Sequence, residues 1–137
     1  MNSSLKLSFA VVLGLALFGC NKNEDLGTIH GTVTYDGAPV TEGTISFRGE
    51  ESGLSVSDEL DAEGKFEVTA AGGIPPGTYK AFIVPPEVEV SIGPDVAPVL
   101  KPKDMPNVPK EYRSIRTTPL TAEVSIGDNE VNFELKK

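Results

Sequence analysis

Most of the chain after residue 27 alternates between hydrophobic and polar residues with a period of two. In residues 28–35, for example, Ile29, Gly31, Val33 and Tyr35 share one side. Successive side chains of a strand point to opposite faces, so this alternation is typical of a strand with one buried face. The same pattern predicts strands in six further segments: 44–48, 54–57, 65–69, 78–84, 120–126 and 131–135.

Short polar and glycine-rich segments separate these expected strands. Asp36-Gly37, Asp61 to Gly64, 72–77 and Gly127-Asp128-Asn129 are typical turn sequences, because glycine accepts positive φ angles and Asp and Asn favour turns. Val88, Val90 and Ile92 also alternate and would add an eighth strand at a sheet edge. Seven or eight short strands without helical periodicity predict an all-β domain over residues 27–137, an antiparallel Greek-key sandwich. A closed barrel is the alternative.

Residues 93–119 interrupt the strand pattern. This segment has no clear period, and five prolines lie within residues 94–109: Pro94, Pro98, Pro102, Pro106 and Pro109. It is too long for an ordinary connection, so we expect a long loop that covers the core or is partly mobile. Its prolines could also present a polyproline II segment to a partner, although a stiff covering loop is the simpler interpretation.

The first nineteen residues form a different kind of segment. Lys6 is the only charge before an apolar run from Leu7 to Gly19. A basic start followed by a short apolar stretch is typical of a secretory signal peptide. The run of about a dozen residues is too short for a permanent transmembrane helix, which needs about 20.

The apolar run ends in Leu17-Phe18-Gly19-Cys20, which resembles the bacterial lipobox, although Phe18 departs from the usual small residue. The resemblance implies cleavage between Gly19 and Cys20 and lipid on the Cys20 thiol, with fatty acyl chains such as palmitate. Residues 20–26 would then tether the domain to a bacterial membrane, inner or outer, with the domain in the periplasm or outside the cell. The alternative is an ordinary secreted protein with an unpaired cysteine.

Charge limits the partners of the mature chain. The full sequence carries 12 basic and 20 acidic residues. Loss of residues 1–19 removes one lysine, so 11 basic residues against 20 acidic ones give a net charge of −9. This balance excludes an electrostatic case for nucleic acid. The expected partners are the membrane, through the lipid, and an envelope protein or polysaccharide.

The inventory of reactive side chains offers no catalytic site. His30 is the only histidine, and it falls on the strand face opposite Ile29 and Val33. A nucleophile needs a base within hydrogen-bond reach and a group that orients the base, and no such arrangement is evident. One histidine and an acylated cysteine cannot make a zinc site. We therefore expect no enzyme and no cofactor.

Two features remain as candidate ligand contacts. Asp58, Asp61 and Glu63 gather around one expected turn, and carboxylate oxygens suit Ca²⁺. Their spacing does not match the calcium loop of EF-hands, and acidic residues are common in exposed turns. Tyr112 is the one tyrosine outside the inward-facing strand positions, so it is the aromatic side chain that we would test for carbohydrate contact.

Several turn segments together resemble a known domain family. Residues 31–40 (GTVTYDGAPV), 57–66 (SDELDAEGKF) and 74–79 (IPPGTY) are similar, in order and spacing, to motifs of carboxypeptidase regulatory-like and transthyretin-like domains. Residues 108–112 and 118–120 resemble a variant from small planctomycete-type lipoproteins. The resemblance implies a seven-stranded transthyretin-like, or prealbumin-like, sandwich and no established activity. We therefore hypothesise a structural or protein-interaction module, with a carbohydrate- or Ca²⁺-binding module as the alternative.

Overall fold

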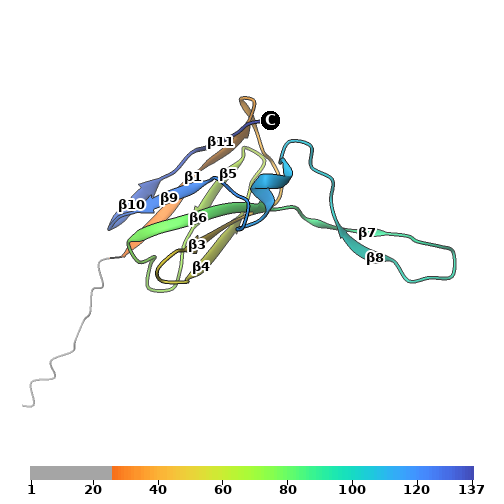
Figure 1. Cartoon of the computed structure of the whole chain (residues 1–137), viewed down its shortest axis with the longest axis horizontal. Helices are drawn as coiled ribbons and strands as arrows, with labels where there is room; N and C mark the ends of the chain where they lie inside the picture. Colours follow the sequence, from red (N-terminus) through yellow and green to blue (C-terminus); the bar gives the residue numbers. More distant parts are fainter. Residues whose placement is uncertain (1–25) are drawn as a thin grey trace, which may run out of the picture.

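The strands of the computed structural model lie in two facing sheets and one separate hairpin (Figure 1). The structure describes residues 26–137, and the predicted signal peptide, the Gly19–Cys20 cleavage site, lipidated Cys20 and nearly all of the tether lie outside this range. The expected all-β sandwich is confirmed. The strands are β1 (Gly27–Tyr35), β2 (Ala38–Pro39), β3 (Thr44–Gly49), β4 (Ser55–Glu59), β5 (Lys65–Val68), β6 (Gly77–Val84), β7 (Glu87–Val90), β8 (Val99–Pro102), β9 (Thr121–Val124), β10 (Gly127–Glu130) and β11 (Phe133–Leu135).

The first sheet is built around β1. Strands β2 and β5 pair with β1 in antiparallel fashion. On its other side β1 pairs with β10 and then with β11, both in parallel. The sequence predicts antiparallel neighbours and a turn at 127–129, whereas those residues begin β10. The reason is that β9 belongs to the opposite sheet, so the chain crosses between the sheets and enters the first one in the direction of β1.

The second sheet has the order β4-β3-β6-β9 and is antiparallel throughout. Its inward side chains alternate with outward ones, as the sequence pattern predicts. Phe47 of β3 lies 5.6 Å from Phe66 and 6.1 Å from Phe133, ring centroid to ring centroid. This cluster joins the two sheets at the centre of the core. The core also contains fully buried aliphatic residues of both sheets: Ile29, Val33, Ile45, Val68, Ala81, Ile83 and Leu135.

Tight turns hold the hairpins as their sequences predict. Asp36 and Gly37 have φ angles of 48° and 80°, the positive values of a type I′ turn between β1 and β2. The Val40 N–H closes this hairpin on the Val33 carbonyl at 2.9 Å. The β4–β5 connection ends at Gly64, whose φ of 71° also needs a residue without a Cβ.

Residues 93–119, expected as one loop, divide into two parts with different structures. The first part completes a hairpin, because β8 pairs with β7, and this hairpin projects from the sandwich (Figure 1). We call residues 87–102 the arm. The second part covers the core through Met105, Val108 and Tyr112 and includes the 3-10 helix η1 (Lys110–Arg113). The expected eighth strand therefore exists as β7, but it pairs in the arm.

The described residues contain almost no helix. Within 26–137, no helix is long and apolar enough to span a membrane.

Candidate functional site

A groove of about 650 Å³ lies where β1, β5 and β10 meet the edge of β4. It is the first candidate for a ligand site on the surface of residues 26–137. Acidic residues predominate in its walls, which consist of His30, Gly31, Thr32, Asp58, Glu59, Asp61, Lys65, Phe66, Glu67, Asp128, Glu130 and Asn132.

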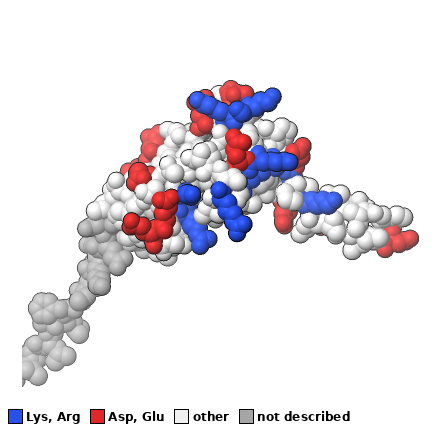
Figure 2. Space-filling model, in the orientation of Figure 1, with Lys and Arg blue, Asp and Glu red and all other residues white. Residues whose placement is uncertain are grey.

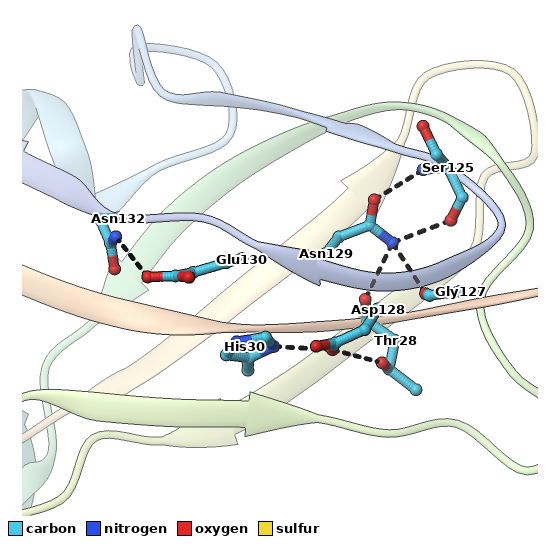
Figure 3. Close-up of polar contacts among 8 residues, drawn as sticks. All are labelled: Thr28, His30, Ser125, Gly127, Asp128, Asn129, Glu130 and Asn132. Atoms are coloured by element: carbon cyan, nitrogen blue, oxygen red, sulfur yellow. Dashed lines mark hydrogen bonds and ion pairs between the residues drawn. The ribbon is translucent and has the colours of Figure 1, made fainter.

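His30 occupies the middle of this groove. Since Ile29 points into the core, its neighbour His30 faces outward, as the alternation predicts, and its side chain is 37% exposed. Nδ1 of His30 lies 2.8 Å from Oδ1 of Asp128, which also accepts a hydrogen bond from the Thr28 hydroxyl (Figure 3). In the sheet His30 is flanked by Glu67 on β5 and Glu130 on β10. The imidazole thus pairs with Asp128 and has a glutamate at the neighbouring register position on each adjacent strand.

Two asparagine side chains hold the C-terminal strands against β1. Asn129 Nδ2 donates to the carbonyls of Thr28, Ser125 and Gly127 (Figure 3). Asn132 Oδ1 accepts from the main-chain N–H and the hydroxyl of Thr32, where β1 changes partner from β10 to β11. These contacts hold β10 and β11 in place beside β1 and so fix this wall of the groove.

Gly31 makes this change of partner possible. A Cβ at Gly31 would overlap the main-chain carbonyl of Val131. Because glycine has none, the backbone at Val131 can approach closely, and the Val131 N–H donates to the His30 carbonyl at 2.8 Å. The close approach places Glu130 and Asn132 beside His30.

The acidic turn forms one end of the groove, but its carboxylates are already engaged. Asp61 Oδ1 accepts the N–H groups of Lys65 and Glu63, and these two backbone hydrogen bonds hold the pKa of Asp61 below its usual value. Asp58 Oδ2 accepts the Glu67 N–H at 2.8 Å and so ties β4 to β5. Glu63 pairs with Lys65 at 2.7 Å, a hydrogen bond that raises the pKa of Lys65.

The chemistry available to this groove follows from these engagements. Asp58 and Asp61 border the groove together, whereas Glu63 lies outside its walls. Among residues 26–137 there is no group of three or more His, Cys, Asp or Glu side chains arranged to hold a metal ion. Among residues 26–137, the His30 side chain pairs with Asp128, and no hydrogen bond joins it to a hydroxyl group. The groove can therefore offer carboxylate oxygens to a polar or cationic ligand, while the amide oxygen of Asn132 is already engaged by Thr32.

Tyr112, the aromatic residue selected from the sequence, has a structural position. It is 6% exposed, and its hydroxyl makes hydrogen bonds to the main chain of Lys136. Its ring therefore offers no free face to a ligand. Tyr79, expected inside, is 1% exposed, and Tyr35 packs partly buried against the core.

Sequence reasoning missed the β10 side of the groove. The sequence pattern predicts a turn at Asp128 and no site at Glu130 or Asn132. A signal was present, because these three polar residues alternate and so share one face of a strand.

The arm is the second candidate site. Most large hydrophobic residues exposed among residues 26–137 lie on it or at its base: Val84, Val88, Ile92, Val96 and Leu100. Figure 2 shows that most of the visible surface of the arm is uncharged, with acidic atoms at its tip and basic atoms nearer its base. Its base is fixed by an ion pair of 2.7 Å between Lys103 and Glu42. Exposed apolar residues concentrated in one segment make the arm a candidate interaction surface.

Comparisons with known proteins give only a likeness of fold. The chain matches no protein-family model and no curated protein. The major pilin subunit of Bacillus cereus is similar over 81% of this chain and 29% of its own, with 16% identity and a TM-score of 0.43. A 9R-lipoxygenase from Cyanothece is similar over 98% of this chain and 18% of its own, with 10% identity and a TM-score of 0.43. The chain spans less than a third of either protein, and no residue role is transferred from them.

Proposed function

We propose that this protein is a non-enzymatic, lipid-anchored β-sandwich of the bacterial cell envelope that binds another envelope protein through its arm. The observation that carries the proposal is that the described chain enters the sandwich at one end and the arm leaves it at the other (Figure 1). The described chain enters at Leu26, where Gly27 bridges Ile74 just before β6. The arm leaves just after the other end of β6. Eight residues of strand separate these points by roughly 25 Å.

The anchor itself is supported by the sequence. An apolar run that ends in Leu17-Phe18-Gly19-Cys20 has the form of a lipoprotein signal, and Cys20 is the only cysteine. Two or more acyl chains would hold the domain firmly at a membrane, since each buried CH₂ contributes about 0.8 kcal/mol. An anchor at one end leaves the arm at the other end free to reach a partner.

We also propose that the sandwich belongs with the carboxypeptidase regulatory-like and transthyretin-like domains. The motifs behind this resemblance coincide with one hairpin of the first sheet and with two connections between the sheets. Asp36-Gly37 joins β1 to β2, Gly64 precedes β5, and Gly77 opens β6. Turns at each of these motif positions, within a β-sandwich, support the assignment.

The anchor is tested by mass spectrometry of the mature N-terminus. The full chain is expressed with its own signal in a bacterium, and the membrane fraction is analysed. We expect residues 1–19 to be absent and Cys20 to carry acyl mass. Cys20→Ser is the control and should leave the membrane fraction. An unmodified Cys20, or cleavage elsewhere, would remove the anchor from the proposal.

Partner binding is tested by crosslinking in intact envelopes. The full chain is compared with a variant in which the arm is replaced by a two-residue turn. We expect a crosslinked protein with the full chain that is lost with the variant. Equal crosslinking of both chains would show that the arm is not the binding element.

A second candidate function is ligand binding in the groove around His30. The carboxylates of its walls favour a polyhydroxylated ligand such as a polysaccharide, and Ca²⁺ is the second alternative because no three of these side chains are arranged to hold a metal ion. A ligand that binds only the native state raises Tm, so melts of the full chain with and without Ca²⁺ and a panel of glycans test this function. No shift with any of them would exclude it.

A further inference from the structure

The two edges of the arm differ in what their main chains offer. The Lys103 N–H donates to the Pro86 carbonyl at 2.8 Å, and the pairs Val88–Lys101 and Val90–Val99 follow along the hairpin. In an antiparallel ladder, every second pair exchanges hydrogen bonds and the pairs between them turn their main-chain groups outward. The outward residues are therefore Glu87 and Glu89 on β7, and Pro98, Leu100 and Pro102 on the β8 side.

Prolines close the outer edge of β8. Pro98 and Pro102 lack the N–H that a further strand would need, so Leu100 has the one outward N–H among the three. The outer edge of β7 has no such block, because Glu87 and Glu89 both have a free N–H and carbonyl. Among residues 26–137, β8 is the one strand that pairs with β7. The arm is thus open for strand pairing on one side only.

From this asymmetry we infer that the outer edge of β7 accepts an extended segment of the partner protein as a third strand. This inference rests on the proposed function and names the partner's chemistry. Side chains of a new strand would lie beside those of β7 on each face. Next to Glu87 and Glu89 basic residues are favoured, and next to Val88 and Val90 apolar ones. The occupant is an extended segment in which apolar and basic residues alternate.

Charge also decides against a second copy of this chain as the occupant. In an antiparallel β7–β7 pair that keeps the apolar faces together, glutamates would stand opposite glutamates across the new ladder, because Glu87 and Glu89 share one face. Like charges directly opposite one another destabilise a strand pair. A segment with basic residues at those positions meets no such repulsion.

The first test uses synthetic peptides and amide exchange. The full chain, purified in detergent, is mixed with an eight-residue peptide of alternating valine and lysine, and hydrogen exchange is followed by NMR. We expect slower exchange of the Glu87 and Glu89 amides, while the inward amides of Val88 and Val90 change little. An alternating valine–glutamate peptide is the control and should not bind. Binding of both peptides alike, or of neither, would overturn the inference.

The second test closes the open edge with proline. Glu89→Pro removes an outward N–H without breaking the β7–β8 ladder, and Leu100→Pro does the same on the opposite strand, directly across from it. We expect Glu89→Pro to weaken valine–lysine peptide binding about tenfold, and Leu100→Pro to leave it unchanged. Circular dichroism checks that both variants fold. An equal loss in both, or in neither, would exclude β7 as the binding edge.

Two further results separate this inference from the proposed function. Dimerisation of the full chain, lost in Glu89→Pro, would make a second copy the occupant and overturn the partner chemistry. Peptide binding in solution does not require the lipid, so an unmodified Cys20 would refute the anchor alone. Arm-dependent crosslinking in envelopes without any valine–lysine peptide binding would leave the proposed function standing and refute the strand addition.

Discussion

Strands β6 and β7 follow one another in the chain and show the same alternation, yet the apolar side chains of β6 are buried and those of β7 are not. Tyr79, Ala81 and Ile83 of β6 are at most 1% exposed, whereas Val88 of β7 is 38% exposed. The difference lies in what faces them: β6 is covered by the first sheet, and β7 has only β8 beside it. Alternation therefore fixes the direction of side chains, but burial requires a second layer.

Two prolines cause the separation of these strands. The last pair between β6 and β3 is Val84 with Thr44, and Pro85-Pro86 follows at once. Neither proline has an N–H to continue the ladder, so the chain leaves the sheet there. The sandwich is stabilised by packing between layers, while the arm is held by its own hairpin and by the contact at its base.

The largest expected effect comes from removing a core ring. Phe47→Ala deletes the residue that contacts Phe66 and Phe133, and we expect the free energy of unfolding to fall by about 3–5 kcal/mol. Urea unfolding followed by circular dichroism measures it. Phe82→Ala, on the outward face of β6, is the matched control and should cost clearly less because Phe82 is only half-buried. Equal losses would contradict the distinction between covered and uncovered faces.

A smaller loss of stability is expected when residues 103–119, the segment that covers the core, lose the hydrogen bonds of Arg113. The Arg113 guanidinium donates to the carbonyls of Met105 and Val108, both at 2.7 Å. Arg113→Ala leaves these carbonyls without that donor, and we expect a loss of about 1.5–3 kcal/mol in urea unfolding. Arg116→Ala, at an exposed position nearby, should change stability little. If both variants behave alike, the covering segment does not depend on the Arg113 contacts.

How much could be predicted from the sequence depends on whether a feature is local. The strands and their buried faces could be predicted, because Ile29, Phe47 and Ile83 lie in unbroken alternation. The pattern within each strand is enough to identify its buried face. The positive φ values at Asp36 and Gly37 likewise follow from local turn chemistry. The two sheets were therefore predictable in their parts.

Features that depend on distant residues could not be predicted. The parallel pairing of β1 with β10 joins residues about 100 positions apart and depends on the missing side chain of Gly31. The β10 wall of the groove depends on this pairing, so the local pattern does not reveal Asp128 and Glu130 as part of a site. Residues 93–119 contain both part of the arm and the segment that covers the core. Their prolines predict where regular structure ends, but not which structure follows.

A pH-dependent effect is expected at the turn between β4 and β5. The N–H groups of Lys65 and Glu63 lower the pKa of Asp61, so the folded state favours the charged carboxylate. This stabilisation is fully present above the unfolded pKa, near 3.8, and is lost as pH falls through the lower folded value. Asp61→Asn keeps a neutral acceptor and removes the titration.

Stability measured from about pH 5 down to pH 2 tests this expectation. The advantage of the wild type over Asp61→Asn should shrink as the medium becomes more acidic. Glu134→Gln, at an exposed position of β11, is the control and should run parallel to the wild type. A constant difference between wild type and Asp61→Asn across this range would show that the turn does not depend on the charge of Asp61.

The smallest effect on stability is expected from removing the arm altogether. Pro86 and Lys103 already form the pair that closes the base, so an Asn-Gly turn can join them in place of residues 87–102. The ion pair of Lys103 with Glu42 and the buried Met105 would remain. We expect the free energy of unfolding in urea to change by no more than about 0.5 kcal/mol, because the main contacts of β7 and β8 are with each other. A loss as large as that of Phe47→Ala would mean that the arm belongs to the folding unit. An unchanged stability would show that the fold does not need the exposed valines and the open edge of the arm.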